Sequence, residues 1–144
     1  MPFRRVLIAV DSEPVAAHAA DVGIELARSL AAEIAFIHVV DPKNDSHPES
    51  GVGSSELAVR LQAGAKKLLE VFCGHLPADL KALEFVRTGE AATEIVNTAK
   101  QWEADVIVIG THGRCGIKRA ILGSVAEKVM RQAPCPVLAV RARC

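Results

Sequence analysis

The stretch Asp105-Val-Ile-Val-Ile109-Gly110-Thr-His-Gly113-Arg-Cys-Gly-Ile-Lys-Arg-Ala-Ile-Leu-Gly123-Ser124 passes from a strongly apolar run into a glycine-rich loop. The run Val106–Ile109 is typical of a strand that is buried on both faces. The residues from Ser124 to Ala133 follow a helical pattern. A buried strand therefore opens into a loop that closes where a helix begins, and the unpaired backbone N–H groups there suit an anionic phosphate.

The same alternation of apolar strand and amphipathic helix extends through the chain. Strands are predicted over Arg5–Val10, Glu33–Val40, Lys81–Arg87, Val106–Ile109 and Cys135–Arg141, and helices over Pro14–Ala31, Ser54 to about Phe72, Ala91–Trp102 and Ser124–Ala133. Alternation of this kind favours parallel pairing through right-handed crossovers. The sequence therefore predicts one α/β domain over residues 1–144, with a five-stranded, doubly wound parallel sheet and helices on both faces.

Details of the pattern give further expectations about individual elements. The strand Lys81–Arg87 alternates only partly and the strand Cys135–Arg141 has a proline at its start, so both are expected near sheet edges. The polar stretch of about residues 42–54 is long for a connection inside a compact domain, which predicts a functional or mobile loop. Ser12 is the expected N-cap of the first helix. The inward side of that helix is expected to carry Val15, Ala19, Val22, Leu26 and Leu30.

Composition excludes several classes of function. Lys plus Arg and Asp plus Glu number 17 each, and this balance argues against a dedicated nucleic-acid or anionic-membrane binder. No apolar run is long enough to span a membrane. The four cysteines form no C-x-x-C pair, and His18, His47 and His75 form no metal-ligand pattern, so no metal site is predicted. We expect reduced thiols and a cytoplasmic protein.

Several residues collect where predicted strands end. In open parallel sheets, ligands bind beyond the carboxyl ends of the strands, where the strand order reverses. Asp11 follows the first strand, Val39–Asp41 end the second, and Gly110 follows the fourth. His38 is expected to pack or to form a hydrogen bond at its strand end. In an alternative interpretation, the glycines are ordinary turn residues and Ser124 is an ordinary N-cap. The loop also matches neither the P-loop motif nor the G-x-G-x-x-G motif of dinucleotide-binding folds.

The glycine spacing G-x2-G-x9-G-[ST], placed after the last-but-one strand, resembles the signature of the universal stress protein family. Val6–Asp11 resembles that family's first strand with its acidic residue, and His38-Val39 resembles the end of its second strand. Gly123–Val129 and Ala133–Leu138 resemble its C-terminal signature. The resemblance extends over essentially the whole chain.

The resemblance implies a Rossmann-like, homodimeric fold with strand order 3-2-1-4-5 that often binds ATP. The dimer contact is implied at Val137–Arg141, a strand that would otherwise be an exposed apolar edge. Carried over by position, it implies that Val10 and Asp11 lie near the adenosine, that Val39 offers backbone groups to the adenine edge, that Gly110 abuts the ribose, and that Gly113, Gly123, Ser124 and Val125 hold the phosphates.

Three cations in the loop could bind phosphate, and one residue near it departs from the family pattern. Arg114 adjoins Gly113 and is the expected phosphate partner, whereas Lys118 and Arg119 stay undecided between phosphate and solvent. Ala126 departs from some nucleotide-binding members, which carry a hydroxyl residue there.

The carboxylates suggest at most a supporting role for a metal ion. Asp11 or Asp41 could hold Mg²⁺ through water. No nucleophile–base pair and no residue that would position a hydrolytic water is apparent, so no catalytic residue is assigned. Cys115 could be a redox position, although a lone loop cysteine is more often incidental. The sequence predicts an ATP-binding stress-response regulator; the alternatives are a nucleotide-independent dimeric interaction module and a weak ATPase.

Overall fold

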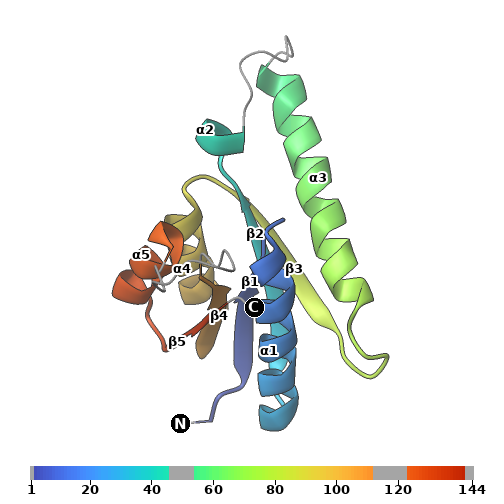
Figure 1. Cartoon of the computed structure of the whole chain (residues 1–144), viewed down its shortest axis with the longest axis vertical. Helices are drawn as coiled ribbons and strands as arrows, with labels where there is room; N and C mark the ends of the chain where they lie inside the picture. Colours follow the sequence, from blue (N-terminus) through green and yellow to red (C-terminus); the bar gives the residue numbers. More distant parts are fainter. Residues whose placement is uncertain (1, 46–53, 112–122, 142–144) are drawn as a thin grey trace.

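The five strands lie parallel in one sheet (Figure 1). The computed structural model describes residues 2–45, 54–111 and 123–141. The strands are β1 (Arg5–Ala9), β2 (Glu33–Val40), β3 (Ala82–Thr88), β4 (Val106–Gly110) and β5 (Val137–Val140). Their order across the sheet is β3-β2-β1-β4-β5, with every neighbouring pair parallel. The predicted fold class and strand order are confirmed, as are the edge positions of the third and last strands.

Helices cover both faces of this sheet. The helices are α1 (Pro14–Leu30), the short α2 (Pro42–Asp45), α3 (Ser54–Gly74), α4 (Ala91–Trp102) and α5 (Ser124–Gln132). Residues of α1 and α3 pack on one face and residues of α4 and α5 on the other. The four predicted helices are confirmed to within a residue or two, and α2 occupies the start of the stretch that was expected to be a loop. No helix in the described part of the chain is long and apolar enough to cross a bilayer.

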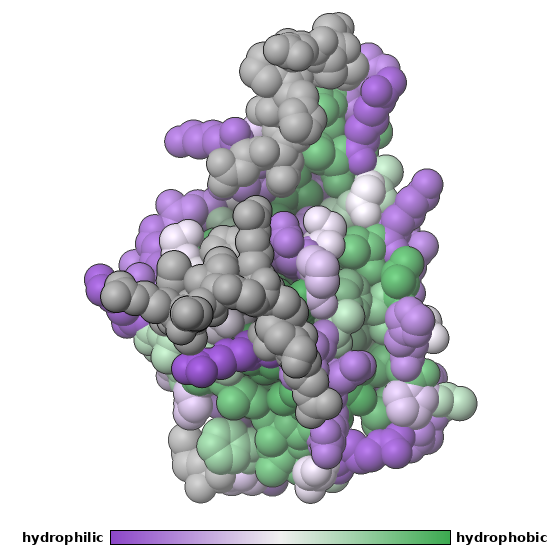
Figure 2. Space-filling view, viewed as in Figure 1, coloured by the Kyte–Doolittle hydropathy of each residue, from purple (hydrophilic) through white to green (hydrophobic). Residues whose placement is uncertain are grey.

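Alternate strand residues divide the core into two apolar layers. Ile8 and Phe36 point toward the α1 and α3 side, whereas Leu7 and Ile37 point toward the α4 and α5 side, and all four side chains are buried. A strand that is apolar on both faces cannot lie at a solvated surface, so β1 and β2 must be sandwiched between helices. Figure 2 shows charged and polar side chains around the outside of this body and apolar surface on the viewed face beside α1.

The inward side of α1 differs from the prediction. The buried positions of α1 are small: Ala16, Ala19, Ala20, Gly23 and Ala27. Leu30, which was expected to point inward, is 38% exposed, and the larger apolar residues of the helix are only partly buried. The cause is close packing, because a Cβ placed on Gly23 would lie 2.6 Å from Cδ1 of Ile8. Small residues therefore face the sheet, and larger ones fill the flanks.

The start of α1 also differs from the prediction. The N-cap is Glu13 rather than Ser12, and no side-chain hydrogen bond caps the helix among the described residues. Instead, Oδ1 of Asp11 accepts a hydrogen bond from the backbone N–H of Glu13 at 2.9 Å, so the carboxylate shapes the turn ahead of the helix.

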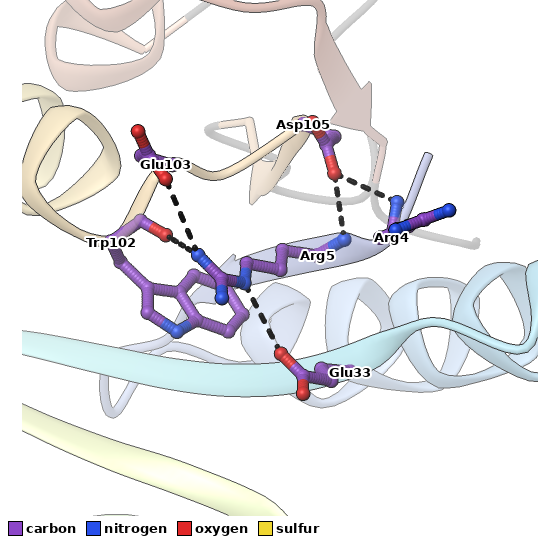
Figure 3. Close-up of polar contacts among 6 residues, drawn as sticks. All are labelled: Arg4, Arg5, Glu33, Trp102, Glu103 and Asp105. Carbon is purple, nitrogen blue, oxygen red and sulfur yellow. Dashed lines mark hydrogen bonds and ion pairs between the residues drawn. The ribbon is translucent and has the colours of Figure 1, made fainter. Parts of the chain in front are cut away.

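The amino end of the sheet is closed by a cluster of polar contacts (Figure 3). Oδ2 of Asp105 accepts hydrogen bonds from the backbone N–H groups of Arg4 at 2.7 Å and Arg5 at 2.9 Å, which joins the start of β1 to the start of β4. The Arg5 guanidinium donates to the carbonyl oxygen of Trp102 at 2.7 Å and pairs with Glu33 at 3.2 Å. The polar groups at this end of the sheet are therefore hydrogen-bonded or ion-paired with one another.

Candidate functional site

A pocket of about 320 Å³ lies at the opposite, carboxyl end of the sheet. It opens beyond the ends of β1, β2 and β4, where the chain crosses from one side of β1 to the other, and its volume is in the range of small-molecule sites. The pocket brings together the predicted site residues Val10, Asp11, Val39, Gly110, Gly123, Ser124 and Val125. Gly113 and Arg114 lie outside the described residues, as do Lys118, Arg119 and Cys115.

One wall of the pocket is the start of α5. The N-cap is Gly123, and Ser124 takes the first helical position with an exposed side chain, so the reading of Ser124 as N-cap is wrong. The first helical hydrogen bond runs from the backbone N–H of Glu127 to the carbonyl of Gly123 at 2.9 Å. The backbone N–H groups of the preceding turn therefore have no helical acceptor and lie on the positive end of the helix dipole.

Gly110 ends β4 beside the start of α1. A Cβ on Gly110 would lie 2.9 Å from Cγ1 of Val15, closer than real Cβ contacts allow. This glycine therefore has a packing role in bringing α1 against β4, in addition to any role toward a ligand. The next residue, Thr111, is buried and is fixed by hydrogen bonds to the carbonyl of Val140, through its backbone N–H at 2.8 Å and its hydroxyl at 3.3 Å.

The ends of β1 and β2 are tied together at the pocket. The backbone N–H of Val10 donates to the carbonyl of Ile37 at 2.9 Å, and Nδ1 of His38 lies 2.9 Å from the carbonyl oxygen of Val10. Because a carbonyl oxygen only accepts, Nδ1 must carry the proton in this contact. The expectation that His38 forms a hydrogen bond at its strand end is confirmed. The bond fixes the backbone immediately ahead of Asp11.

The described lining carries negative but no positive side chains. Asp11, Glu13 and Asp41 line the pocket, whereas its described lining contains no Lys or Arg. Oδ1 of Asp41 accepts the backbone N–H of Lys43 at 3.0 Å, which starts α2. The described side chains thus favour hydroxyl and amino groups on this side of the pocket. An anionic group would have to lie toward the backbone N–H groups of α5.

A cation on α5 is already paired. Lys128 donates to the carboxylate of Glu90, the N-cap residue of α4, and Thr93 donates to the same carboxylate at 3.0 Å. The hydrogen bond from Lys128, followed by that from Thr93, lowers the pKa of Glu90 from its ordinary value. This contact joins the starts of two helices that border the pocket.

Apart from Ala126, the floor of the pocket was not predicted. It is apolar and includes Ile37, Ile95, Ile109 and Ala126. Ala126 is only 2% exposed and points into the layer between the sheet and α5. Ala126 reaches the pocket because it lies on the side of α5 that faces the sheet. The helical periodicity of α5 could have indicated this orientation.

Neither described cysteine has the environment of a reactive thiolate. Burial, and then the hydrogen bond and negative charge of Glu84, raise the pKa of the Cys73 thiol to about 12. Burial, and then the charge of Asp105, raise the pKa of Cys135, which is half-buried. Among the described residues, no group of three or more His, Cys, Asp or Glu side chains could hold a metal ion.

Trp102 is a packing residue. Its ring lies edge-on to Phe85 with centroids 6.1 Å apart, and the guanidinium of Arg5 lies over it at 5.7 Å. Figure 3 shows the indole beside Arg5 at the amino end of the sheet, and Trp102 is not among the residues that line the pocket at the carboxyl end. A stacking role for Trp102 toward a ligand in the pocket is therefore excluded.

Comparison with known proteins gives matches over nearly the whole chain. The sequence model of the universal stress protein family matches residues 2–141. Universal stress protein MJ0531 of Methanocaldococcus jannaschii is 36% identical, with 96% of this chain and 82% of the relative aligned. Universal stress protein YxiE of Bacillus subtilis is 31% identical, with 96% and 99% aligned. The solved structure of universal stress protein UspA from Lactobacillus plantarum superposes with a TM-score of 0.81 at 26% identity, over 98% of this chain and 99% of that one.

Proposed function

The chain belongs to the universal stress protein family, and on that premise we propose that it is a stress-response regulator that binds ATP in the pocket beyond β1, β2 and β4. The observation that carries the proposal is the pairing, in one pocket, of an apolar floor with the backbone N–H groups of a helix start. A nucleotide has both an apolar ring and an anionic chain, so it matches both halves.

The charged groups that line the pocket favour one orientation of the bound nucleotide. Asp11 and Val39 lie at the ends of β1 and β2, where a carboxylate and strand-end backbone groups can accept from ribose hydroxyls and the adenine amino group. The phosphates then lie toward Gly123, Ser124 and Val125 at the start of α5, with Gly113 and Arg114 completing the phosphate site as the sequence predicts. The adenosine end lies against β1 and β2 because phosphates there would meet carboxylates.

Two solved structures with the same fold are consistent with an adenine nucleotide. A universal stress protein in complex with cAMP superposes with a TM-score of 0.63 at 20% identity. A universal stress protein from Archaeoglobus fulgidus in complex with dAMP superposes with a TM-score of 0.60 at 22% identity. At these identities the likeness shows the fold alone, so the choice of ATP rests on the pocket and on the glycine spacing of this chain.

We expect Mg²⁺ to bind together with ATP, with ligands from both the nucleotide and the protein. Asp11 and Asp41 both lie at the pocket, and a carboxylate can hold Mg²⁺ through water while the ion binds the phosphates.

Calorimetry with Mg-ATP tests the proposal. We expect binding by the wild-type protein and its loss in Gly123→Val, because a side chain at the N-cap would stand against the phosphates. Val59→Thr, a change on the exposed side of α3, is the control and should bind normally. Absence of binding heat with the wild-type protein would contradict the proposal. A steady-state assay for ADP release distinguishes a regulator from a weak ATPase, and the regulator should release almost none.

We propose in addition that the protein is a homodimer through Val137–Arg141. β5 is the outer strand next to β4, and Leu138 on it is 39% exposed. An outer strand with an apolar side chain is a pairing surface. Light scattering at micromolar concentration should give twice the monomer mass and Leu138→Asp should halve it. A monomer mass for the wild-type protein would leave only the nucleotide proposal standing.

A further inference from the structure

The opposite edge of the sheet presents an apolar surface that ends in a cation. Leu83, Phe85 and Arg87 alternate along β3 and share the side of the sheet that α4 covers. We call these three side chains the β3 strip. Phe85 is half-buried against Trp102, but Leu83 is 52% exposed. The strip therefore leaves the cover of α4 at Leu83 and reaches solvent at the edge of the sheet.

Two arginines flank the aromatic pair Phe85 and Trp102, and their surroundings differ. The Arg5 guanidinium lies over Trp102 and has two carboxylates beside it, Glu33 at 3.2 Å and Glu103 at 3.8 Å (Figure 3). The Arg87 guanidinium lies over the Phe85 ring at 5.0 Å and donates to the neighbouring carbonyl of Val86 at 3.2 Å. No carboxylate of the described residues lies within ion-pair distance of Arg87. Within the described residues, Arg5 is therefore paired with carboxylates and Arg87 is not.

We propose that the β3 strip docks an extended segment of another protein, which adds to the sheet as a sixth strand beside β3. β3 is an outer strand, so the backbone groups on its free side can pair with such a segment. Leu83 takes an apolar side chain of the segment, and Arg87 takes a carboxylate. Since Leu83 and Arg87 are four positions apart on one face, the apolar and acidic residues of the partner stand four positions apart as well.

A second copy of this chain fits the strip poorly. Another β3 would bring Leu83, Phe85 and Arg87, because Glu84 points to the other face, toward Cys73. β5 is Val137–Val140 followed by Arg141, and it supplies no acid either. Charge complementarity therefore favours a different protein with an acidic, strand-forming segment. The inference is independent of nucleotide binding, since none of the strip lines the pocket.

The experiment uses an N-acetylated peptide, Thr-Leu-Thr-Val-Thr-Glu-Thr, added to the full chain at low salt. Its Leu and Glu have the required separation, and we expect weak binding with a Kd on the order of 1 mM, as short unstructured peptides must be ordered on binding. Amide chemical shifts should change along β3. The emission of Trp102 should change with them, because it is the single tryptophan in a chain without tyrosine.

Variants test whether the carboxylate meets Arg87. Arg87→Gln should weaken peptide binding about tenfold. A peptide with Gln in place of Glu should bind the wild-type protein about tenfold more weakly as well. When both changes are combined, the affinity should fall no further, because both remove the same contact. Arg131→Gln removes an exposed arginine that is paired with Glu127 on α5, and it should bind the peptide normally. Shift changes that lie away from β3, or equal affinity in Arg87→Gln, would overturn the proposal. A dimer that Leu83→Asp converts to a monomer would assign the strip to a second copy instead.

Discussion

The two ends of the sheet are built from the same strands but in opposite ways. At the amino end, Asp105 and Arg5 accept and donate hydrogen bonds that lock β1, β2 and β4 together (Figure 3). At the carboxyl end, the same strands open around a pocket whose lining combines carboxylates, an apolar floor and the start of α5. Stabilising contacts and the pocket thus lie at opposite ends of the same strands, and we expect each to be changed with little effect on the other.

The largest expected effect comes from adding a negative charge at the start of α5, where the proposed phosphates lie. Ser124→Glu places a carboxylate where the proposed phosphates lie, and we expect ATP affinity to fall at least about a hundredfold, or about 2.7 kcal/mol. An acid at the first helical position is favourable for α5 itself, so the free energy of unfolding should not fall. Calorimetry and urea unfolding measure the two quantities. Ser124→Ala is the control, and its affinity should change much less.

A smaller effect, confined to stability, is expected at the amino end. Asp105→Ala removes the acceptor of two backbone N–H groups, and we expect the free energy of unfolding to fall by about 2 kcal/mol. Asp105→Asn keeps an oxygen acceptor and should lose less. ATP affinity should stay unchanged in both variants. If Asp105→Ala weakened nucleotide binding as strongly as Ser124→Glu, the separation between the two ends would be wrong.

Variants of Arg5 and Glu33 show which contacts of the amino-end cluster contribute most to the free energy of unfolding. Arg5→Met keeps an apolar stem beside Trp102 but removes the hydrogen bond to its carbonyl and the cation over its ring. We expect a loss of about 1 kcal/mol in the free energy of unfolding. Glu33→Gln removes a partner that is well exposed, and it should cost less than about 0.5 kcal/mol. Thermal or urea unfolding of both variants makes the comparison, and an equal loss in the two would assign the stabilisation to the ion pair.

The smallest effect is a pH dependence on the pocket side. Lys128 lowers the pKa of Glu90, so the ionised form is favoured in the folded protein. A depressed folded pKa stabilises the protein above the unfolded value, and this contribution is lost as the pH falls through the folded pKa. The stability difference between wild type and Glu90→Gln should therefore be present at pH 7 and be lost in acid, as the pH falls through the lowered pKa of Glu90. A difference that persisted in acid would show that the ion pair is not its source.

The strands and the position of the pocket could be predicted because they depend on local patterns. Apolar runs fix which segments are strands, and the carboxyl ends of parallel strands must meet at one edge. Asp11, Val39 and Gly110 therefore had to lie together once the strand order was known. The glycine spacing placed Gly123 and Ser124 on the same edge. That these residues contact ATP stays a prediction.

What could not be predicted depends on distances between layers. The spacing of Val15, Val22 and Leu26 is helical, but the narrow space above Ile8 admits only the small side of α1. The apolar floor of the pocket was missed for a related reason, since the orientation of α4 and α5 on the sheet decides which residues reach it. The ion pair between Glu90 and Lys128 joins helices that are distant in sequence, and no local pattern marks it.

Gly23 lies on the helix that both covers the core and contributes residues to the pocket. The absence of a side chain at Gly23 lets α1 pack closely on Ile8 of β1, and the first turn of the same helix contributes Val15 and Ala16 to the pocket. A methyl group at residue 23 would lie 2.6 Å from Cδ1 of Ile8, so either this side chain or the helix would have to move. Through α1, the packing of the core is thus coupled to the lining of the pocket.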